Sequence, residues 1–223
     1  MREVHLHDEA IEPLIREVFS SAFPVVLMEL RGVFGLLAPH TREGAAALNR
    51  AKERKTGKHY GSIAGNLDAL IANANADSII QTPEALNILE GCFIRFSMKN
   101  QGLGETICNG THQVLIEESG LRAVIQSWET QGPEVFPIPY PLCTSANLSG
   151  HVEGSITELS KALDFGLERG VPLFIHTGML GNQTGSYPII EELEQGELRL
   201  ARKCPDGDAI LAALNTLQHS ANY

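Results

Sequence analysis

Apolar residues follow two different periods along this chain, and together they predict a mixed α/β protein. A helical spacing of apolar side chains predicts an amphipathic helix over residues 8–20, whereas short apolar runs predict strands over 23–30 and 33–38. The same signals predict further helices over 43–51, 66–75, 82–89, 156–167 and 206–218, and further strands over 61–64, 92–98, 172–176, 187–193 and 197–202. Because helices and strands alternate and hairpin-like strand pairs stand at both ends, we expect a mixed sheet rather than a doubly wound parallel one.

Three segments carry weaker signals. Residues 100–110 are rich in glycine, which predicts a loop, and residues 129–141 hold four prolines, which predicts an extended connection. Residues 112–126 are ambiguous between helix and strand. The chain has 223 residues, which suits one domain, so we expect a single domain over 1–223 with an N-terminal helix in residues 1–22 and a closing helix over 206–218.

Composition and charge narrow the class of protein. The four cysteines are widely spaced without a Cys-x-x-Cys pair, which argues against a zinc site and against a disulfide framework, so we expect no metal ligands. The charged N-terminus is not typical of a secretory signal, and no apolar run approaches the length of a membrane span, so we expect a cytoplasmic protein without a membrane partner. The net charge of −10 argues against general nucleic-acid binding. One local basic cluster remains over residues 50–58, either an ordinary solvated surface or a phosphate contact.

The segment with the most chemical information is Cys-Thr-Ser-Ala-Asn-Leu-Ser-Gly at residues 143–150. It follows an apolar, proline-bearing stretch and precedes the helix expected over 156–167, so it falls at a junction between a strand and a loop. Small hydroxyl and amide side chains at such a junction can bind an anion without filling the space that a ligand needs. The alternative is a turn with a helix cap, because the same residue types favour turns.

Two motifs in the right order resemble the YrdC-like family, the threonylcarbamoyl-AMP synthases. Residues 144–150 look like the signature of that family, and Lys52-Glu53-Arg54, followed by Lys58, resembles its Lys-x-Arg motif. The resemblance extends over about 23–203. It implies a single α/β domain in which a twisted mixed sheet with flanking helices surrounds a large concave cavity.

The resemblance also implies a reaction and its participants. Members of the family combine L-threonine, bicarbonate and ATP, with Mg²⁺, into threonylcarbamoyl-AMP and pyrophosphate, and the product serves N6-threonylcarbamoyladenosine formation in tRNA. The macromolecular partners implied are tRNA or double-stranded RNA and tRNA-modification proteins. Lys52 and Arg54 take the catalytic role at the triphosphate, since fixed cations stabilise phosphoryl transfer. The expected nucleotide-binding residues are Lys58, Thr144, Ser145, Asn147 and Arg202.

One departure from the family pattern concerns the end of the site that receives the amino acid. Where the family carries a Thr-Glu pair before its aromatic-Gly-Leu, this chain has Leu30-Arg31, so Arg31 is a substrate-binding candidate. A changed lining there predicts a changed substrate. His112 is the second substrate-binding candidate, with Arg122 as an unaligned alternative.

Three alternatives remain open from the sequence. A related carbamoyl-adenylate enzyme with a different acceptor, as in O-carbamoylation or hydrogenase maturation, would explain the Leu30-Arg31 pair. A non-catalytic nucleotide- or double-stranded-RNA-binding module would use the basic cluster as its surface. Individual residues also have structural readings, namely a solvent-facing arginine at 202 and a structural histidine at 112.

Overall fold

An eleven-stranded mixed sheet runs through the computed structural model, which describes residues 1–54, 59–99, 107–108, 111–129, 140–150, 154–179 and 185–220. The strands are β1 (Arg2–His5), β2 (Val26–Leu30), β3 (Val33–Ala38), β4 (Gly61–Ala64), β5 (Cys92–Phe96), β6 (Ile107–Cys108), β7 (Thr111–Ile116), β8 (Leu142–Ser145), β9 (Leu173–His176), β10 (Ile189–Glu192) and β11 (Leu198–Arg202). Their order in the sheet is β1-β9-β2-β3-β8-β4-β7-β5-β10-β11, and β6 pairs with β7 off this path. The order contains both parallel and antiparallel pairs, which confirms the mixed sheet.

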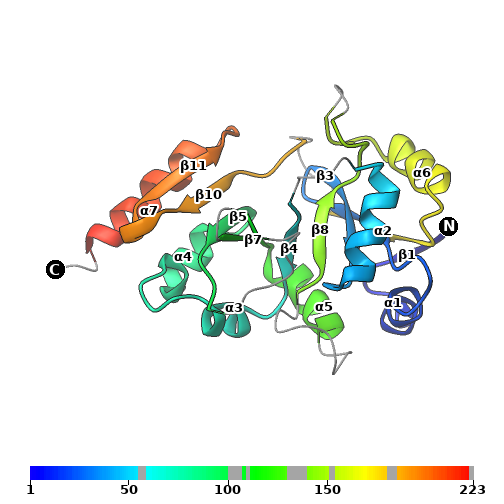
Figure 1. Cartoon of the computed structure of the whole chain (residues 1–223), viewed down its shortest axis with the longest axis horizontal. Helices are drawn as coiled ribbons and strands as arrows, with labels where there is room; N and C mark the ends of the chain where they lie inside the picture. Colours follow the sequence, from blue (N-terminus) through cyan, green and yellow to red (C-terminus); the bar gives the residue numbers. More distant parts are fainter. Residues whose placement is uncertain are drawn as a thin grey trace.

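Helices flank the sheet along its length (Figure 1). They are α1 (Ile11–Phe19), α2 (Arg42–Lys52), α3 (Leu67–Asn73), α4 (Pro83–Ile88), α5 (Ser119–Glu129), α6 (Leu159–Glu168) and α7 (Gly207–Ser220), with 3₁₀ turns η1 (Ile79–Gln81) and η3 (Glu194–Gly196). In Figure 1, α1, α2 and α6 lie at the end of the molecule that holds the N-terminus, whereas α7 lies with β10 and β11 at the other end. Within the described residues, no helix combines the length and the apolar character needed to cross a bilayer.

Alternation along the strands divides the core into separate apolar clusters. Cys92, Ile94 and Phe96 of β5 pack with α3, α4 and α7, while Phe93 between them points to the other side of the sheet and packs with residues of α1 and α5. A third cluster joins α2 and α6 to β2 and β3. The two-residue period of these strands thus places one set of side chains against each layer of helices.

Two parts of the sequence behave differently from the expectation. The ambiguous stretch 112–126 divides into β7 and α5, because its apolar residues change from strand spacing to helical spacing near Glu117. Residues Arg2–His5 form a strand parallel to β9 that the apolar pattern did not predict, since most of its side chains are exposed. Most of the loop expected over 100–110 and of the connection expected over 129–141 lies outside the described residues.

The strand order determines where the sequence motifs meet. β8 lies between β3 and β4 and is antiparallel to both, with Ser145 opposite Gly35. β10 pairs in parallel with β5, so the residues before β10 lie beside the beginning of β5, where the Phe93 N–H donates to the Pro188 carbonyl at 2.9 Å. The end of β8 and the segment before β10 therefore approach the same space.

Candidate active site

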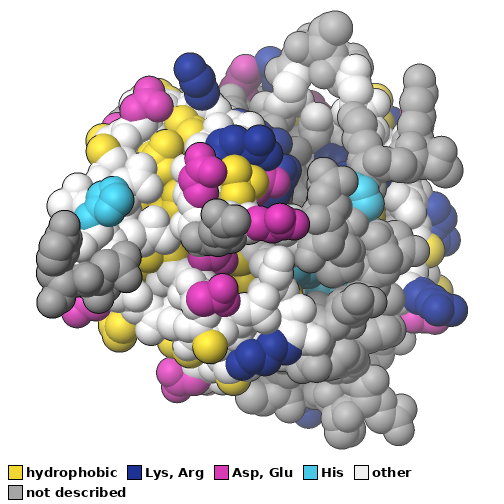
Figure 2. Space-filling model, turned by 60° about the vertical axis from the view of Figure 1, so that its left-hand side comes forward, with side chains coloured by type: hydrophobic (Ala, Val, Ile, Leu, Met, Phe, Trp, Pro, Cys, Tyr) yellow, Lys and Arg dark blue, Asp and Glu magenta, His cyan; other side chains and the backbone are white. Residues whose placement is uncertain are grey.

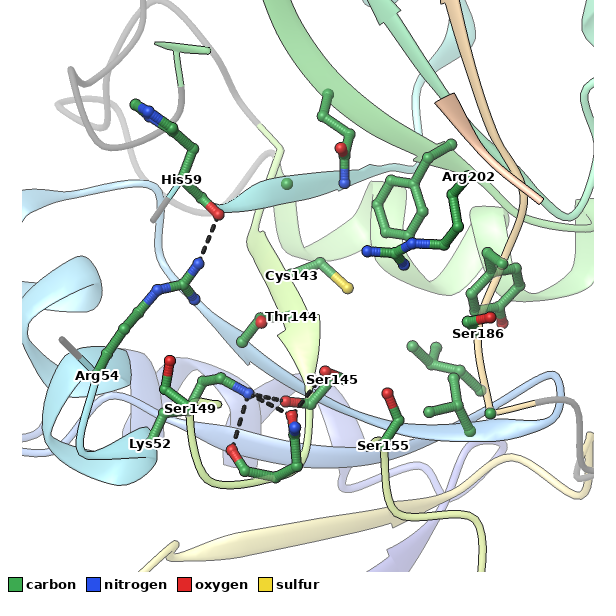
Figure 3. Close-up of a pocket in the computed structure, with 18 of the residues that line it drawn as sticks. Lys52, Arg54, His59, Cys143, Thr144, Ser145, Ser149, Ser155, Ser186 and Arg202 are labelled. Atoms are coloured by element: carbon green, nitrogen blue, oxygen red, sulfur yellow. Dashed lines mark hydrogen bonds between the residues drawn. The ribbon is translucent and has the colours of Figure 1, made fainter. Parts of the chain in front are cut away.

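A cavity of about 240 Å³ opens where the end of β8 meets the loop after α2 and the segment before β10. Figure 3 shows Lys52, Arg54 and Ser149 on one side of this space and Ser186 and Arg202 on the other, across the strand that carries residues 143–145. The volume is somewhat below the roughly 300–1,000 Å³ that is usual for small-molecule sites. The two sides of the cavity differ in chemistry.

Lys52 is placed at one side by the end of helix α2. The Thr41 hydroxyl caps the start of this helix by accepting from the Gly44 N–H at 3.0 Å. At the other end Glu53 adopts a left-handed conformation with φ of 47°, which turns the chain sharply after Lys52. The Lys52 side chain is therefore held at the C-terminal end of helix α2, and the residue is only 3% exposed.

The Lys52 ammonium group joins the two sequence motifs. Its Nζ donates to the backbone carbonyl of Ser145, to the backbone carbonyl of Asn147 at 2.9 Å and to the Asn147 side-chain oxygen at 2.8 Å. The Ser145 hydroxyl donates to the same Asn147 oxygen at 2.8 Å, and the Ser149 N–H donates to the Lys52 carbonyl at 3.0 Å. A buried ammonium requires such partners, because an unpaired charge away from water is very costly.

Arg54 presents a second cation beside Lys52. Its guanidinium lies 3.9 Å from the centre of the Tyr60 ring, and Nη2 donates to the His59 carbonyl at 2.6 Å. The Arg54 Nε is buried without a hydrogen-bond partner among the described residues. The stacking fixes the plane of the guanidinium, so its remaining donors are available to an anionic group in the cavity.

Residues 144–150 comprise the end of β8 and the loop after it, beside these cations (Figure 3). The loop is anchored on both sides, because the Ala146 N–H donates to the Phe34 carbonyl at 2.7 Å and the Ile156 N–H donates to the Ala146 carbonyl at 3.1 Å. Thr144, Ser149 and Ser155 add hydroxyl groups to the lining. Together with Lys52 and Arg54, they give this side the donors and positive charge that a phosphate requires.

Five residues form an apolar wall on the opposite side of the cavity, which also carries Ser186 and Arg202 (Figure 3). Leu30, Val33, Phe93, Cys143 and Tyr187 line it and belong to one hydrophobic cluster. The Phe93 and Tyr187 rings meet edge to face with their centres 5.9 Å apart. Burial, followed by the nearby Glu117 carboxylate, raises the pKa of Cys143 to about 12, so this cysteine remains a thiol and is unsuited to act as a nucleophile.

Behind this wall lies a buried carboxyl group. The Tyr187 hydroxyl donates to Oε1 of Glu117, which is 1% exposed and follows the end of β7. Burial raises the pKa of Glu117 to about 7, and the hydrogen bond from Tyr187 offsets part of that rise. Burial, followed by the Glu117 charge, raises the pKa of Tyr187 well above its usual range, so the phenol keeps its proton.

Arg202 lies at the rim of the cavity at the end of β11. Its side chain is exposed, and partial desolvation followed by the neighbouring Arg95 cation lowers its pKa. An anion bound beside two neighbouring cations reduces the repulsion between them, which is compatible with the expected nucleotide contact.

The structure brings together six of the nine residues expected at the site. Lys52, Arg54, Thr144, Ser145, Asn147 and Arg202 line the cavity. Lys58 lies outside the described residues. Neither Arg31 nor His112 is among the described lining residues, so their assignment to substrate binding stays a prediction without a contact to support it.

Arg31 and His112 have other surroundings. Arg31 is exposed at the β2–β3 turn, and its positive charge lowers the pKa of the buried Glu117. His112 is fully buried, with Nε2 3.1 Å from the Ser62 hydroxyl and its ring stacked on His40 at 5.6 Å between centres. This environment agrees with the structural reading of His112.

Sequence reasoning did not assign Phe93, Tyr187 or Glu117 to the site. Phe93 stands in an apolar strand like many others, and Glu117 is separated from Tyr187 by 70 positions. No local motif links them. Only the parallel pairing of β10 with β5 brings them to the same wall.

Comparisons with known proteins support the fold. No protein-family model matches the sequence, and no curated protein matches it. Among solved structures, P. abyssi Sua5 complexed with L-threonine has a TM-score of 0.64 at 16% identity, with 91% of this chain and 57% of the Sua5 chain covered. E. coli YciO has a TM-score of 0.63 at 15% identity, with 90% and 93% covered. T. kodakarensis HypF has a TM-score of 0.63 at 17% identity, with 87% and 24% covered.

These similarities define the class of fold. The chain has the mixed α/β fold of the Sua5 and YciO structures, which confirms the fold that the YrdC-like resemblance implied. It spans less than three fifths of the Sua5 chains. At identities of 15–17%, the likeness establishes the fold and not the reaction.

Proposed function

We propose that this protein is a nucleotidyltransferase that joins ATP, bicarbonate and an amine into a carbamoyl-adenylate and releases pyrophosphate. The observation that carries the proposal is the Lys52 ammonium group, which binds both Ser145 and Asn147 at one side of the cavity, with Arg54 beside it. Two motifs that resemble one enzyme family are thereby joined into a single site for phosphate. A purely structural lysine would not need a second cation and three hydroxyl groups around it.

Lys52 and Arg54 would act on the triphosphate. In the proposed sequence, the amine nitrogen attacks the carbon of bicarbonate and water leaves, which forms a carbamate. A carboxylate oxygen of the carbamate then attacks the α-phosphorus, the new P–O bond forms, and the bond to the β-phosphate breaks so that pyrophosphate leaves with its electron pair. The charge on the oxygens around phosphorus is stabilised by fixed cations. Arg54 can donate to two phosphate oxygens at once, whereas Lys52 acts as a point charge. Ser145, Asn147 and Thr144 would orient the phosphates.

Mg²⁺ would accompany the nucleotide. The described lining residues include hydroxyl and amide groups but no carboxylate, so they do not form an all-protein metal site. Mg²⁺ commonly binds through substrate phosphates and retains several waters. The proposal therefore assigns the metal to the triphosphate, where it would neutralise charge, with Ser and Thr hydroxyls nearby.

L-Threonine is the first amine to propose, because a Sua5 of the same fold was crystallised with it. The product would then be threonylcarbamoyl-AMP for tRNA modification, with tRNA and tRNA-modification proteins as partners. A second candidate is a different acceptor. The observation that favours it is the apolar wall, in which Leu30 occupies a position where the family carries a polar residue.

A non-catalytic RNA-binding module receives less support. Figure 2 shows acidic and basic side chains interspersed over the β10–β11 end of the molecule rather than a continuous basic surface. A groove there is lined by several carboxylates, namely Asp77, Glu191, Glu192 and Glu194, with Arg199. Such a surface repels a phosphate backbone.

The test is pyrophosphate release by the purified protein with ATP, Mg²⁺ and bicarbonate, with and without an amine. We expect release that depends on the amine and is lost in Lys52→Ala and in Asn147→Ala. Lys161→Ala is the matched control, because Lys161 is exposed and forms an ion pair with Glu158, three residues away. ATP binding without amine-dependent release for any amine would overturn the proposal, and RNA binding with a steep salt dependence would favour the binding module instead.

A further inference from the structure

The apolar wall is the part of the cavity that the proposed phosphate chemistry does not use. Its residues come from β2, β3, β5, β8 and the segment before β10, and they form one continuous cluster. Tyr187 is 6% exposed and Phe93 is 8% exposed, so the small area that each retains faces the cavity they line. Because five separate parts of the chain contribute to this wall, the question is which part of the substrate it could contact.

Tyr187 is held in a fixed orientation within this wall. The Tyr187 hydroxyl donates to Glu117, and the Tyr187 oxygen accepts from the backbone N–H of Arg31. The Tyr187 ring meets the Phe93 ring edge to face. Because the hydroxyl already acts as both a donor and an acceptor, Tyr187 presents its ring to the cavity rather than a polar group.

The charges around Glu117 come from several elements. Burial disfavours the ionised form of Glu117, whereas the hydrogen bonds from Tyr187 and from the Glu118 backbone favour it. The Glu118 carboxylate disfavours the ionised form, and the Arg31 charge favours it. The Glu117 charge in turn raises the pKa of the Cys92 and Cys143 thiols. Glu117 is itself absent from the described lining of the cavity. It acts on the site through Tyr187 and is therefore a positioning residue.

One polar neighbour of this wall, Gln113, already has a hydrogen-bond partner. Gln113 of β7 lines the cavity near Phe93, but its side-chain oxygen accepts from the Arg95 Nε at 2.9 Å. A hydroxyl group on a ligand would lose its water against the five apolar residues of the wall, and of the polar side chains beside them, Ser186 and Gln113, the second is already engaged. Burial of such a group without a partner disfavours binding.

Geometry connects the wall with the amine rather than with the adenosine. In the proposed product, the carbamoyl group is bonded to the phosphate that Lys52 and Arg54 would hold, so the amine side chain lies only a few bonds away. Figure 3 shows these cations and Ser186, the neighbour of Tyr187, on opposite sides of the cavity. A space of about 240 Å³ suits the amine part of the product better than the larger adenosine.

We propose that Tyr187, positioned by Glu117, selects the acceptor and that the wall favours an amine with an apolar side chain over L-threonine. The inference rests on the proposed function, and it specifies the substrate class of the same site. L-Valine and L-threonine are the decisive pair of probes, because the two molecules have nearly the same shape and differ by a methyl group in place of a hydroxyl group.

The experiment measures kcat/KM for amine-dependent pyrophosphate release with L-valine and with L-threonine. We expect the value for L-valine to exceed that for L-threonine by about tenfold or more, as is common for an apolar pocket. Equal values, or a higher value for L-threonine, would overturn the inference while leaving the proposed function intact. Calorimetric titration of both amines into the protein with a non-hydrolysable ATP analogue gives the same comparison without turnover, so a lack of turnover does not obscure it.

Two variants separate selection from folding. Tyr187→Ala should reduce the preference for L-valine to about threefold or less through KM, with the Kd for the ATP analogue unchanged. Tyr187→Phe keeps the ring and loses only the hydroxyl with its hydrogen bond to Glu117, so its preference should fall between those of Tyr187→Ala and the wild-type protein. If Tyr187→Ala does not fold, the preference of the wild-type protein and of Tyr187→Phe decides the question, because a preference lost in Tyr187→Phe would contradict a role for the ring.

Discussion

The two sides of the cavity are built in different ways. On the cation side, Lys52 and Arg54 belong to one short segment, and Ser145 and Asn147 belong to another. The contacts of Lys52 with Ser145 and with Asn147 are enough to assemble this side of the cavity. The apolar wall collects single residues from five parts of the chain, with Glu117 behind it. The comparison indicates that the proposed phosphate chemistry is encoded locally, whereas the proposed selection of the amine depends on how the strands are ordered in the sheet.

The largest expected effect comes from the cation side. Lys52→Met keeps the length of the side chain but removes the charge that joins Ser145 and Asn147. We expect turnover with any amine to fall by at least about 100-fold, because loss of one preorganised donor to a developing charge has this size of effect. Pyrophosphate release measures it, and a melting curve checks that the fold persists.

The matched control for this change is Lys161→Met, at an exposed position of helix α6. Its turnover should equal that of the wild-type protein. If Lys52→Met retained more than about a tenth of the activity, the assignment of this residue to the triphosphate would be wrong.

The next effect concerns the carboxyl group behind the apolar wall. Burial raises the pKa of Glu117 from 4.5 to about 7 in the folded protein. Between these values the folded chain binds more protons than the unfolded chain, so the contribution of Glu117 to stability falls as the pH rises from 4.5 toward 7. Glu117→Gln keeps an acceptor for the Tyr187 hydroxyl and removes the titration. We expect it to be more stable than the wild-type protein above pH 7, by up to about 3 kcal/mol.

Urea unfolding at several pH values measures this difference. It should be largest near pH 8 and close to zero near pH 4, where the carboxyl group is protonated in both states. His40 acts in the opposite direction, because burial lowers its pKa to about 4 and its contribution is lost as the pH falls below 6.5. A difference that does not depend on pH would mean that Glu117 does not titrate in this range.

A smaller effect on amine binding is expected from Gly61→Ala, which crowds Phe93 in the apolar wall. A Cβ atom added at Gly61 would stand 2.9 Å from Cε1 of Phe93 and 3.2 Å from the side-chain nitrogen of Gln113. Gly61→Ala should therefore displace the Phe93 ring by a few tenths of an ångström, at a cost of about 1 kcal/mol in stability. We expect the KM for the amine to change while the Kd for ATP does not, and a change in both would show that the two sides of the cavity are not independent.

The difference between the two sides also explains what the sequence could predict. The order of helices and strands follows from apolar periodicity, and the motif residues meet in the structure because both motifs lie at the ends of regular elements, Lys52 at the end of α2 and Ser145 at the end of β8. The N-terminal strand β1 was missed because its side chains carry no apolar signal and its pairing with β9 supplies the reason for its conformation.

The wall could not be predicted in the same way. Phe93 and Tyr187 resemble ordinary core residues in the sequence, and their contact depends on a parallel pairing between β5 and β10. The positions of Arg31 and His112 in the family resemblance predict substrate contacts, but neither is among the described lining residues, so both assignments stay predictions. Motif spacing finds groups that act together locally, while side chains that meet through the topology of the sheet require the structure.

The smallest expected effect tests whether phosphate binding reaches across the cavity to Arg202 on the opposite rim (Figure 3). Arg202 is exposed near Arg95, and exposed charge pairs contribute roughly 0.2–1 kcal/mol. Arg202→Gln should therefore raise the Kd for ATP by about threefold at low salt, and the effect should shrink at high salt because the charge is screened. Arg199→Gln, also on β11 but paired with Glu191 in the separate groove, should leave the Kd unchanged. Equal affinities for Arg202→Gln and the wild-type protein at low salt would mean that Arg202 is a solvent-facing residue of the last strand and that the phosphate site ends at Lys52 and Arg54.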